Sequence, residues 1–285
     1  MENEFVRQAA GRYTIMTSSS TPIFKFQQGS TPLLVSMPHV GTHIPLSIAQ
    51  CMTEDALRLA DTDWHLELLY DFLDELGCSA IAATHSRYVI DLNRPPDNAN
   101  LYPGQDTTGL CPVDTFERQP LYREGMQPDS AEIERRTAAY WKPYHEALNA
   151  ELQRLRAEHG IAMLWDAHSI ASVVPRFFEG KLTDFNLGTA SGTSCAEELA
   201  NKLSAIANSA SVYTTALNGR FKGGYITRQY GKPANNIHAV QLELSQITYM
   251  EEAFPFRFNE KVAAQVRPTL NRLLEAMLEW AQKHR

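Results

Sequence analysis

Residues 162–172, AMLWDAHSIAS, place three side chains that can do chemistry directly after an apolar run. The run at 161–165 is short and continuous, which is typical of a buried strand. Asp166, His168 and Ser169 are therefore expected where this strand ends. Ligands of open α/β sheets bind at the carboxyl ends of strands, so the stretch predicts one edge of a functional site.

Three further predicted strands carry polar side chains at their ends or within them. They are 33–37 with His39, 88–90 with Asp91, Asn93 and Arg94, and 239–244 with Glu243. A carboxylate inside an apolar strand, such as Glu243, is costly to bury without a partner. Four coincident cases favour one shared site.

Histidines and a carboxylate from separate segments are the ligands of a catalytic zinc ion, which keeps a fourth position for water. Such an ion lowers the pKa of its water to about 7 and polarises a carbonyl. His39 and His168 fit as ligands, and Glu243 fits as a general base beside the metal. We therefore expect one divalent metal ion, with zinc as the expected metal.

The third ligand is expected where Asp61, Asp63 and His65 cluster in the stretch 54–76, whose apolar spacing predicts a helix. We assign Asp63 to the metal. Asp61 is interpreted as a residue that caps or charges a helix N-terminus.

Two other residues compete with Asp63 for this position. His43 lies four residues after His39. Asp166 could bind the metal directly, or it could orient a ligand histidine from outside the metal shell. The residue types alone leave these alternatives open.

Positive side chains predict an acidic substrate. Arg94, next to Asn93, can hold a carboxylate through two parallel hydrogen bonds. In NGRFKGGYITRQYG, Arg228 is expected to be a second carboxylate clamp. Gly223 and Gly224 in the same stretch permit close approach of the backbone to a ligand.

Apolar runs alternate with amphipathic stretches along the chain. The expected strands are 33–37, 80–83, 88–90, 161–165, 212–216 and 239–244. The expected helices are 54–76, 131–158, 194–208 and 258–283, the second interrupted or kinked by Pro143. This alternation predicts an α/β fold with a mostly parallel or mixed central sheet, as one domain over 1–285. The long polar stretch 95–129 is expected to be an active-site loop or lid.

Composition narrows the function class. The 285 residues carry a net charge of −7, which argues against a nucleic-acid binder. No apolar stretch approaches the roughly 20 residues needed to cross a bilayer, and the N-terminus lacks the apolar core of a secretory signal. Four scattered cysteines, Cys51, Cys78, Cys111 and Cys195, form no disulfide or zinc pattern. We expect a cytoplasmic protein whose partner is a small acidic amide, and the oligomeric state stays open.

Six motifs together resemble those of the N-formylglutamate amidohydrolase (N-formylglutamate deformylase) family of histidine catabolism. They are PHVGTHIP, DTDWH, RYVIDLNRPPDN, WDAHSI, NGRFKGGYITRQYG and QLELSQITYM. The resemblance implies a three-layer α/β/α fold like that of zinc carboxypeptidases (phosphorylase/hydrolase-like). It also implies hydrolysis of N-formyl-L-glutamate to L-glutamate and formate.

The resemblance further implies roles for single residues. These are His39 and His168 as zinc ligands, Asn93 and Arg94 as binders of a substrate carboxylate, and Glu243 as the catalytic glutamate. Zinc carboxypeptidases place a glutamate ligand three residues after the first histidine, where this chain has Thr42. Asp63 as the carboxylate ligand is therefore an inference from this sequence.

Three other functions compete with this one. The same chemistry could act on another N-acyl amino acid or on a C-terminal peptide residue. A metal-independent triad could use Ser169 or Ser36 with His168 and Asp166, although no G-x-S-x-G motif is present. The chain could also be a non-catalytic binder of acidic amino acids, a function that gains nothing from Glu243.

Overall fold

The computed structural model describes residues 21–101 and 104–284, which form seven strands and the helices around them. The strands are β1 (Phe24–Gln27), β2 (Leu33–Met37), β3 (Ser79–Ala83), β4 (Ala162–Ile170), β5 (Phe185–Gly188), β6 (Thr215–Leu217) and β7 (Ile237–Ser245). They form one sheet in the order β1-β3-β2-β4-β7-β5-β6. Strands β3, β2, β4 and β7 are parallel, and β1, β5 and β6 run the other way. The predicted α/β class with a mixed sheet is confirmed.

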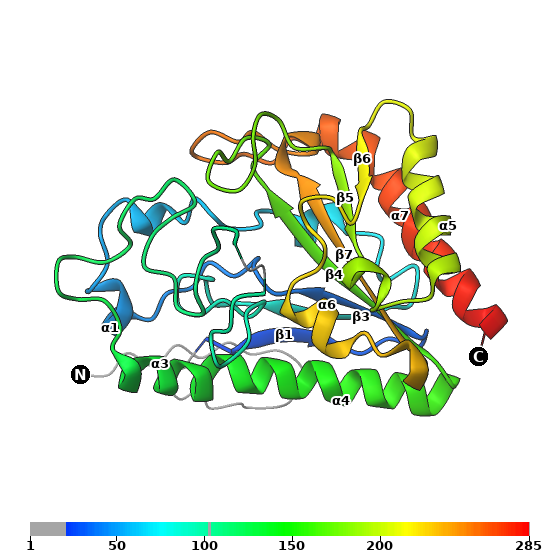
Figure 1. Ribbon diagram of the computed structural model, residues 1–285, viewed down its shortest axis with the longest axis horizontal. Coiled ribbons are helices and arrows are strands. Elements are labelled where there is room, and N and C mark those ends of the chain that lie inside the picture. The colour runs from blue at the N-terminus through cyan, green and yellow to red at the C-terminus, as the bar shows by residue number, and fades with distance from the viewer. Residues whose placement is uncertain (1–20, 102–103, 285) are drawn as a thin grey trace, which may run out of the picture.

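Helices cover both faces of this sheet (Figure 1). The helices of the described residues are α1 (Leu46–Ala49), α2 (Leu66–Leu69), α3 (Ser130–Arg136), α4 (Lys142–His159), α5 (Glu197–Ser209), α6 (Tyr225–Tyr230) and α7 (Glu260–His284), of which α4 and α6 pack on one face of the sheet and α5 and α7 on the other. A π-helical turn at Thr137–Trp141 joins α3 to α4, and Pro143 stands in the first turn of α4, so the predicted interruption is confirmed. Among the described residues, no helix is both long and apolar enough to span a membrane.

Alternate side chains of β4 enter two separate cores. Met163 and Trp165 pack in the core that contains residues of α5 and α7, whereas Ala162 and Leu164 pack in the core that contains residues of α4 and α6. Successive side chains of a strand point to opposite faces. The sheet is therefore buried on both sides, which explains why its central strands read as continuous apolar runs.

The same alternation decides where the polar residues of the two central strands lie. Asp166 and His168 of β4 continue the row on the α4–α6 face, and Ser169 lies on the α5–α7 face. In β7, Glu243 follows Ala239 of the α4–α6 core at even spacing. Because β4 and β7 pair in parallel with His168 opposite Glu243, these two side chains lie side by side on one face.

Several predicted element boundaries are wrong. The strand predicted at 161–165 continues to Ile170, since its pairing with β7 extends over nine residues. Asp166, His168 and Ser169 therefore lie inside the strand and not after it. Residues 88–90 are buried but form a turn, and the strand predicted at 212–216 is only Thr215–Leu217.

The helix predicted over 54–76 is also wrong. Only a 3₁₀ turn at Ala56–Arg58 and the single turn of α2 form there. Leu59 and His65 have backbone φ angles of 56° and 62°, in the left-handed region that a right-handed helix cannot contain. The apolar residues whose spacing suggested a helix lie instead in an irregular segment that is buried on one side.

The predicted loop at 95–129 forms no helix or strand in its described parts, 95–101 and 104–129, beyond isolated bridges. Residues 102 and 103 lie outside the described residues, as does the N-terminal stretch 1–20 that was expected to lack a secretory signal. Closure of the loop as a lid and the single-domain boundary stay predictions. All four cysteines are free.

Candidate metal centre and active site

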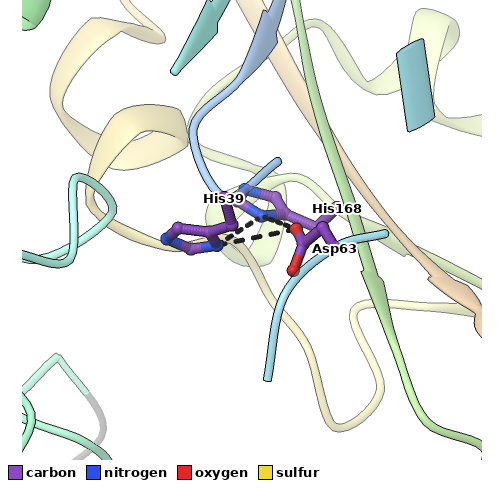
Figure 2. Close-up of side chains that lie close together, drawn as sticks. All are labelled: His39, Asp63 and His168. Carbon is purple, nitrogen blue, oxygen red and sulfur yellow. Dashed lines mark hydrogen bonds and ion pairs between the residues drawn. The ribbon is translucent and has the colours of Figure 1, made fainter. Parts of the chain in front are cut away.

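Three side chains from distant parts of the sequence meet near the carboxyl ends of β2 and β4 (Figure 2). His39 lies two residues beyond β2, His168 lies in β4, and Asp63 lies in the segment before α2. Asp63 Oδ2 is 3.1 Å from His168 Nδ1 and 3.6 Å from His39 Nδ1, and the two Nδ1 atoms are 3.2 Å apart. Tetrahedral ligands at about 2.05 Å from zinc lie roughly 3.3 Å apart, so this buried group fits one ion.

Asp91 and Arg87 support the His39 side of this group. His39 Nε2 donates a hydrogen bond of 2.7 Å to Asp91 Oδ1, which leaves the Nδ1 lone pair directed at the centre of the group. Arg87 Nη2 donates to Asp91 Oδ2 at 2.7 Å, and Arg87 Nη1 lies 3.7 Å from Asp63 Oδ1. A carboxylate behind a ligand histidine selects its tautomer and orients its ring.

Two side chains face Nε2 of His168: Asp166 Oδ2 at 3.2 Å and Asn93 Nδ2 at 2.9 Å. The Asn93 amide nitrogen can only donate, which suits a ring that carries its proton on Nδ1. Asp166 accepts from the other tautomer, and that tautomer frees Nδ1 for a metal. Asp166 therefore occupies the position of a supporting carboxylate behind His168.

Opposing effects set the charges in the group. Burial disfavours the charged form of Asp63, but the charges of His39 and His168 outweigh burial and hold the pKa of Asp63 below its ordinary range. Burial likewise disfavours a charged His168, yet the Asp166 carboxylate raises the pKa of His168 well above its ordinary value. A metal that binds at Nδ1 must therefore displace a proton.

Glu243 lies opposite His168 in the β4–β7 pairing, and both side chains line one cleft together with His39. Burial raises the pKa of Glu243 to about 8, although the charge of His168 opposes this shift. Gln241 Nε2, two residues earlier on the same face, is 3.4 Å from Glu243 Oε2. A carboxyl group with a pKa near neutrality is suited to accept and return a proton.

An open cleft lies over these residues and is lined by His39, His168, Glu243, Asn93, Arg94, Arg87, Arg220, Gly224 and Gln241, among others. Small molecules bind in clefts where a few polar groups converge in this way. Arg94 lines the cleft while its Nε donates to Thr108 O at 2.9 Å. Arg228 is not among the lining residues, and its Nε donates to Gly223 O at 2.8 Å.

The glycine pair brings the start of α6 close to Asn93. A Cβ on Gly224 would lie 2.3 Å from Asn93 Nδ2, so any other residue there would have to displace this amide. Gly223 has a φ of 113°, which favours glycine. Gly224 N donates to Gln241 Oε1 at 2.7 Å, and Ile226 N donates to Asn93 Oδ1 at 2.8 Å. The close approach of the backbone that these glycines permit is thus an approach to the side chain of Asn93.

The competing residues lie elsewhere. His43 is exposed and its ring packs against His85. Asp61 is buried and accepts a hydrogen bond from Phe116 N, so its interpretation as a helix-capping residue is wrong. Ser36 Oγ is 3.0 Å from Tyr144 Oη. Ser169 points to the opposite face from His168, which removes the alignment that a nucleophilic triad needs.

Sequence reasoning missed Arg87 and gave Asp91 no specific role. Arg87 is buried, and its guanidinium lies 4.8 Å from the centre of the Phe116 ring. The available signal was a charged residue within SRYVIDLN, an otherwise apolar buried stretch, four residues before Asp91. A buried arginine needs carboxylate partners, and here the partners are residues of the site.

Comparisons with known proteins show the family of this chain. The family model for N-formylglutamate amidohydrolase matches residues 31–250. An N-formylglutamate deformylase of Pseudomonas aeruginosa is 51% identical over 261 residues, covering 92% of this chain and 98% of that protein. One of Pseudomonas putida is 52% identical over 258 residues, covering 90% and 96%. The crystal structure of N-formylglutamate amidohydrolase from Ralstonia eutropha JMP134 matches with a TM-score of 0.77 and 26% identity, over 92% of this chain and 99% of that one. The chain belongs to the N-formylglutamate amidohydrolase family.

Proposed function

We propose that this chain hydrolyses N-formyl-L-glutamate to L-glutamate and formate with one divalent metal ion, zinc, held by His39, Asp63 and His168. The observation that carries the proposal is a buried group of His39, Asp63 and His168 whose two histidines line the same cleft as Glu243. The curated relatives are named for this reaction. A role in histidine degradation and a cytoplasmic location are parts of the same proposal.

The donor set supports zinc. Two imidazole nitrogens and one carboxylate are ligands that a catalytic zinc ion uses, with one position left for water. When bound, the ion supplies Lewis acidity, which acidifies a water molecule and polarises the formyl carbonyl. Asp91 and Asp166 hold the outer nitrogens of His39 and His168 and so keep the rings directed inward.

Glu243 moves the proton in this mechanism. Its carboxylate accepts a proton from the water that attacks the formyl carbon, and a carbon–oxygen bond forms. The carbon–nitrogen bond then breaks, and Glu243 delivers the proton to the leaving amine of glutamate. The second proton of the water leaves the formic acid and charges the free amine, so that formate and L-glutamate with an ammonium group are released, and Glu243 returns to its starting carboxylate form. The burial that raises the pKa of Glu243 makes it a stronger base than an exposed carboxylate.

Arginines hold the two substrate carboxylates. Arg94 and Arg220 both line the cleft, and each guanidinium can form two parallel hydrogen bonds to a carboxylate. Asn93 lines the same cleft, with its amide 2.9 Å from His168 Nε2, and would orient the substrate. Arg228, outside the cleft lining, stays a prediction as a carboxylate clamp, as do Gly223 and Gly224 as ligand contacts.

The first test is formate release from N-formyl-L-glutamate before and after chelation, with zinc then added back. Loss on chelation and recovery with zinc is the expected result. Activity that persists in protein shown by elemental analysis to be metal-free would contradict the metal mechanism. N-acetyl and N-succinyl glutamate, compared in the same assay, test the acyl group: faster turnover of either would contradict the substrate assignment.

A further inference from the structure

The segment that carries Asp63 is held in place from outside. Between Leu59 and His65 it forms no helix or strand, yet its backbone groups are bonded one after another. The bonds are Asp61 N to Tyr88 Oη (3.2 Å), Gln246 Nε2 to Thr62 O (3.0 Å), Asp63 N to His39 O (3.1 Å) and Tyr249 Oη to Trp64 O (2.9 Å). An irregular segment without such bonds would leave buried polar groups unpaired.

Two of these bonds lie on either side of Asp63 and come from one short stretch. Gln246 binds the carbonyl before Asp63, and Tyr249 binds the carbonyl after it. Both side chains are buried and lie in the 3₁₀ turn Gln246–Thr248 and the residue that follows it. This stretch directly follows β7, the strand that carries Glu243.

Ser169 connects the same two side chains to β4. Its Oγ lies 2.7 Å from Tyr249 Oη and 3.4 Å from Gln246 Nε2. The phenol has one proton, and the Trp64 carbonyl can only accept, so Tyr249 donates to Trp64 and accepts from Ser169. The neighbour of Ser169 in the chain is His168. One network thus joins the segment of Asp63 to the strand of His168.

We propose that Gln246 and Tyr249 are positioning residues that hold Asp63 at the distance from His39 and His168 that metal binding requires. The proposal rests on the proposed metal site. It assigns a purpose to the end of QLELSQITYM that is separate from Glu243. Without the two bonds, the Asp63 carboxylate would sample positions outside the metal shell, and each binding event would have to order it again.

The experiment measures the zinc affinity of the metal-free protein by competition with a chromophoric chelator. The variants are Tyr249→Phe, which removes one hydroxyl, Gln246→Met, which removes the amide, and both together. The matched control is Tyr70→Phe. Tyr70 is also a buried tyrosine whose hydroxyl has a hydrogen-bond partner, Trp165 Nε1 at 3.0 Å, but it has no bond to the Asp63 segment.

Each single variant should weaken zinc binding by about tenfold, the lower range for partners of metal ligands, and the double variant should weaken it further. Tyr70→Phe should keep wild-type affinity at a similar loss of thermal stability. Wild-type affinity in Tyr249→Phe and Gln246→Met would overturn the proposal, as would an equal loss in Tyr70→Phe or a wild-type protein that binds no zinc. A wild-type protein that binds zinc but releases no formate would sink the proposed function and leave this inference standing.

Discussion

The site is built from two regions that position their side chains in different ways. Strand β4 sets His168 opposite Glu243 through a regular ladder of nine residue pairs with β7. The segment 59–65 sets Asp63 through side-chain bonds from other elements, at two left-handed backbone positions. In the first region one backbone pattern decides every position, and in the second each residue depends on a separate partner.

This difference shows why the two regions should respond differently to substitution. A ligand in a ladder keeps its direction when a neighbouring side chain changes, because backbone pairing decides which face it points to. A ligand in an irregular segment loses its direction when its outside partners are removed. His39, which follows the end of β2, belongs with the second kind, since Asp91 orients its ring.

The largest effect should come from the paired strands β4 and β7, because β7 carries the proposed general base. Glu243→Gln keeps the shape of the side chain but removes the proton acceptor, and kcat should fall by about 10²- to 10⁴-fold. Zinc content by elemental analysis should stay that of the wild type, because Glu243 is not among the three proposed ligands. Near-normal turnover with full zinc would exclude Glu243 as the base.

Arg87→Met tests the residues that separate side-chain partners hold in place, here Asp63 and Asp91. It leaves Asp91 and Asp63 buried without their cation, and the metal-free protein should lose about 3–5 kcal/mol of unfolding free energy. Urea unfolding would measure the loss. The matched control is Arg118→Met, whose exposed pair with Asp106 should contribute less than about 1 kcal/mol. Equal losses in the two variants would contradict a special role for Arg87.

A pair of matched variants compares the two histidines directly. Asp91→Asn should weaken zinc binding by about 100-fold and Asp166→Asn by about tenfold, the two ends of the usual range for such partners. The reason is that β4 already orients His168, whereas His39 depends on Asp91. Chelator competition would measure both, and the reverse order would break the comparison between the regions.

A smaller effect should appear in the pH dependence of stability. His145 Nε2 donates to Leu92 O at 2.9 Å, and so holds the turn between Asp91 and Asn93. Burial lowers the pKa of His145 from 6.5 to about 4. The unfolded chain therefore binds more protons between these values, and stability present above pH 6.5 is lost as the pH falls toward 4.

The protonation of His145 should therefore lower the unfolding free energy by roughly 2 to 3 kcal/mol between pH 7.5 and 4.5. His145→Gln keeps an N–H donor but cannot titrate, so its urea-unfolding free energy should fall less over that interval. A slope equal to that of the wild type would show that His145 is not the group responsible.

The paired strands β4 and β7 could be predicted well from the sequence, and the segment 59–65 could not. Apolar runs located β2, β3, β4 and β7, because strands buried on both faces are continuously apolar. The short strands β1 and β5 carry too few apolar residues to stand out. The stretch 54–76 was predicted as a helix because its apolar spacing reflects burial alone. Two of the bonds that hold it come from residues 184 and 185 positions away in the sequence.

The site shows the same division. His39, His168 and Glu243 were found because each belongs to an apolar strand or follows one. Asp63 needed a choice among several carboxylates, and Arg87 was missed because its partners become neighbours only in the folded chain.

The contact between Gly224 and Asn93 also limits which substitutions can occur at these two positions during evolution. Since a Cβ at position 224 would overlap the amide of Asn93, any other residue there displaces Asn93 from His168. A substitution at position 224 should therefore disturb the same contacts as a substitution of Asn93. We therefore expect these two positions, 131 residues apart in the sequence, to be substituted together and not one at a time in proteins descended from this one.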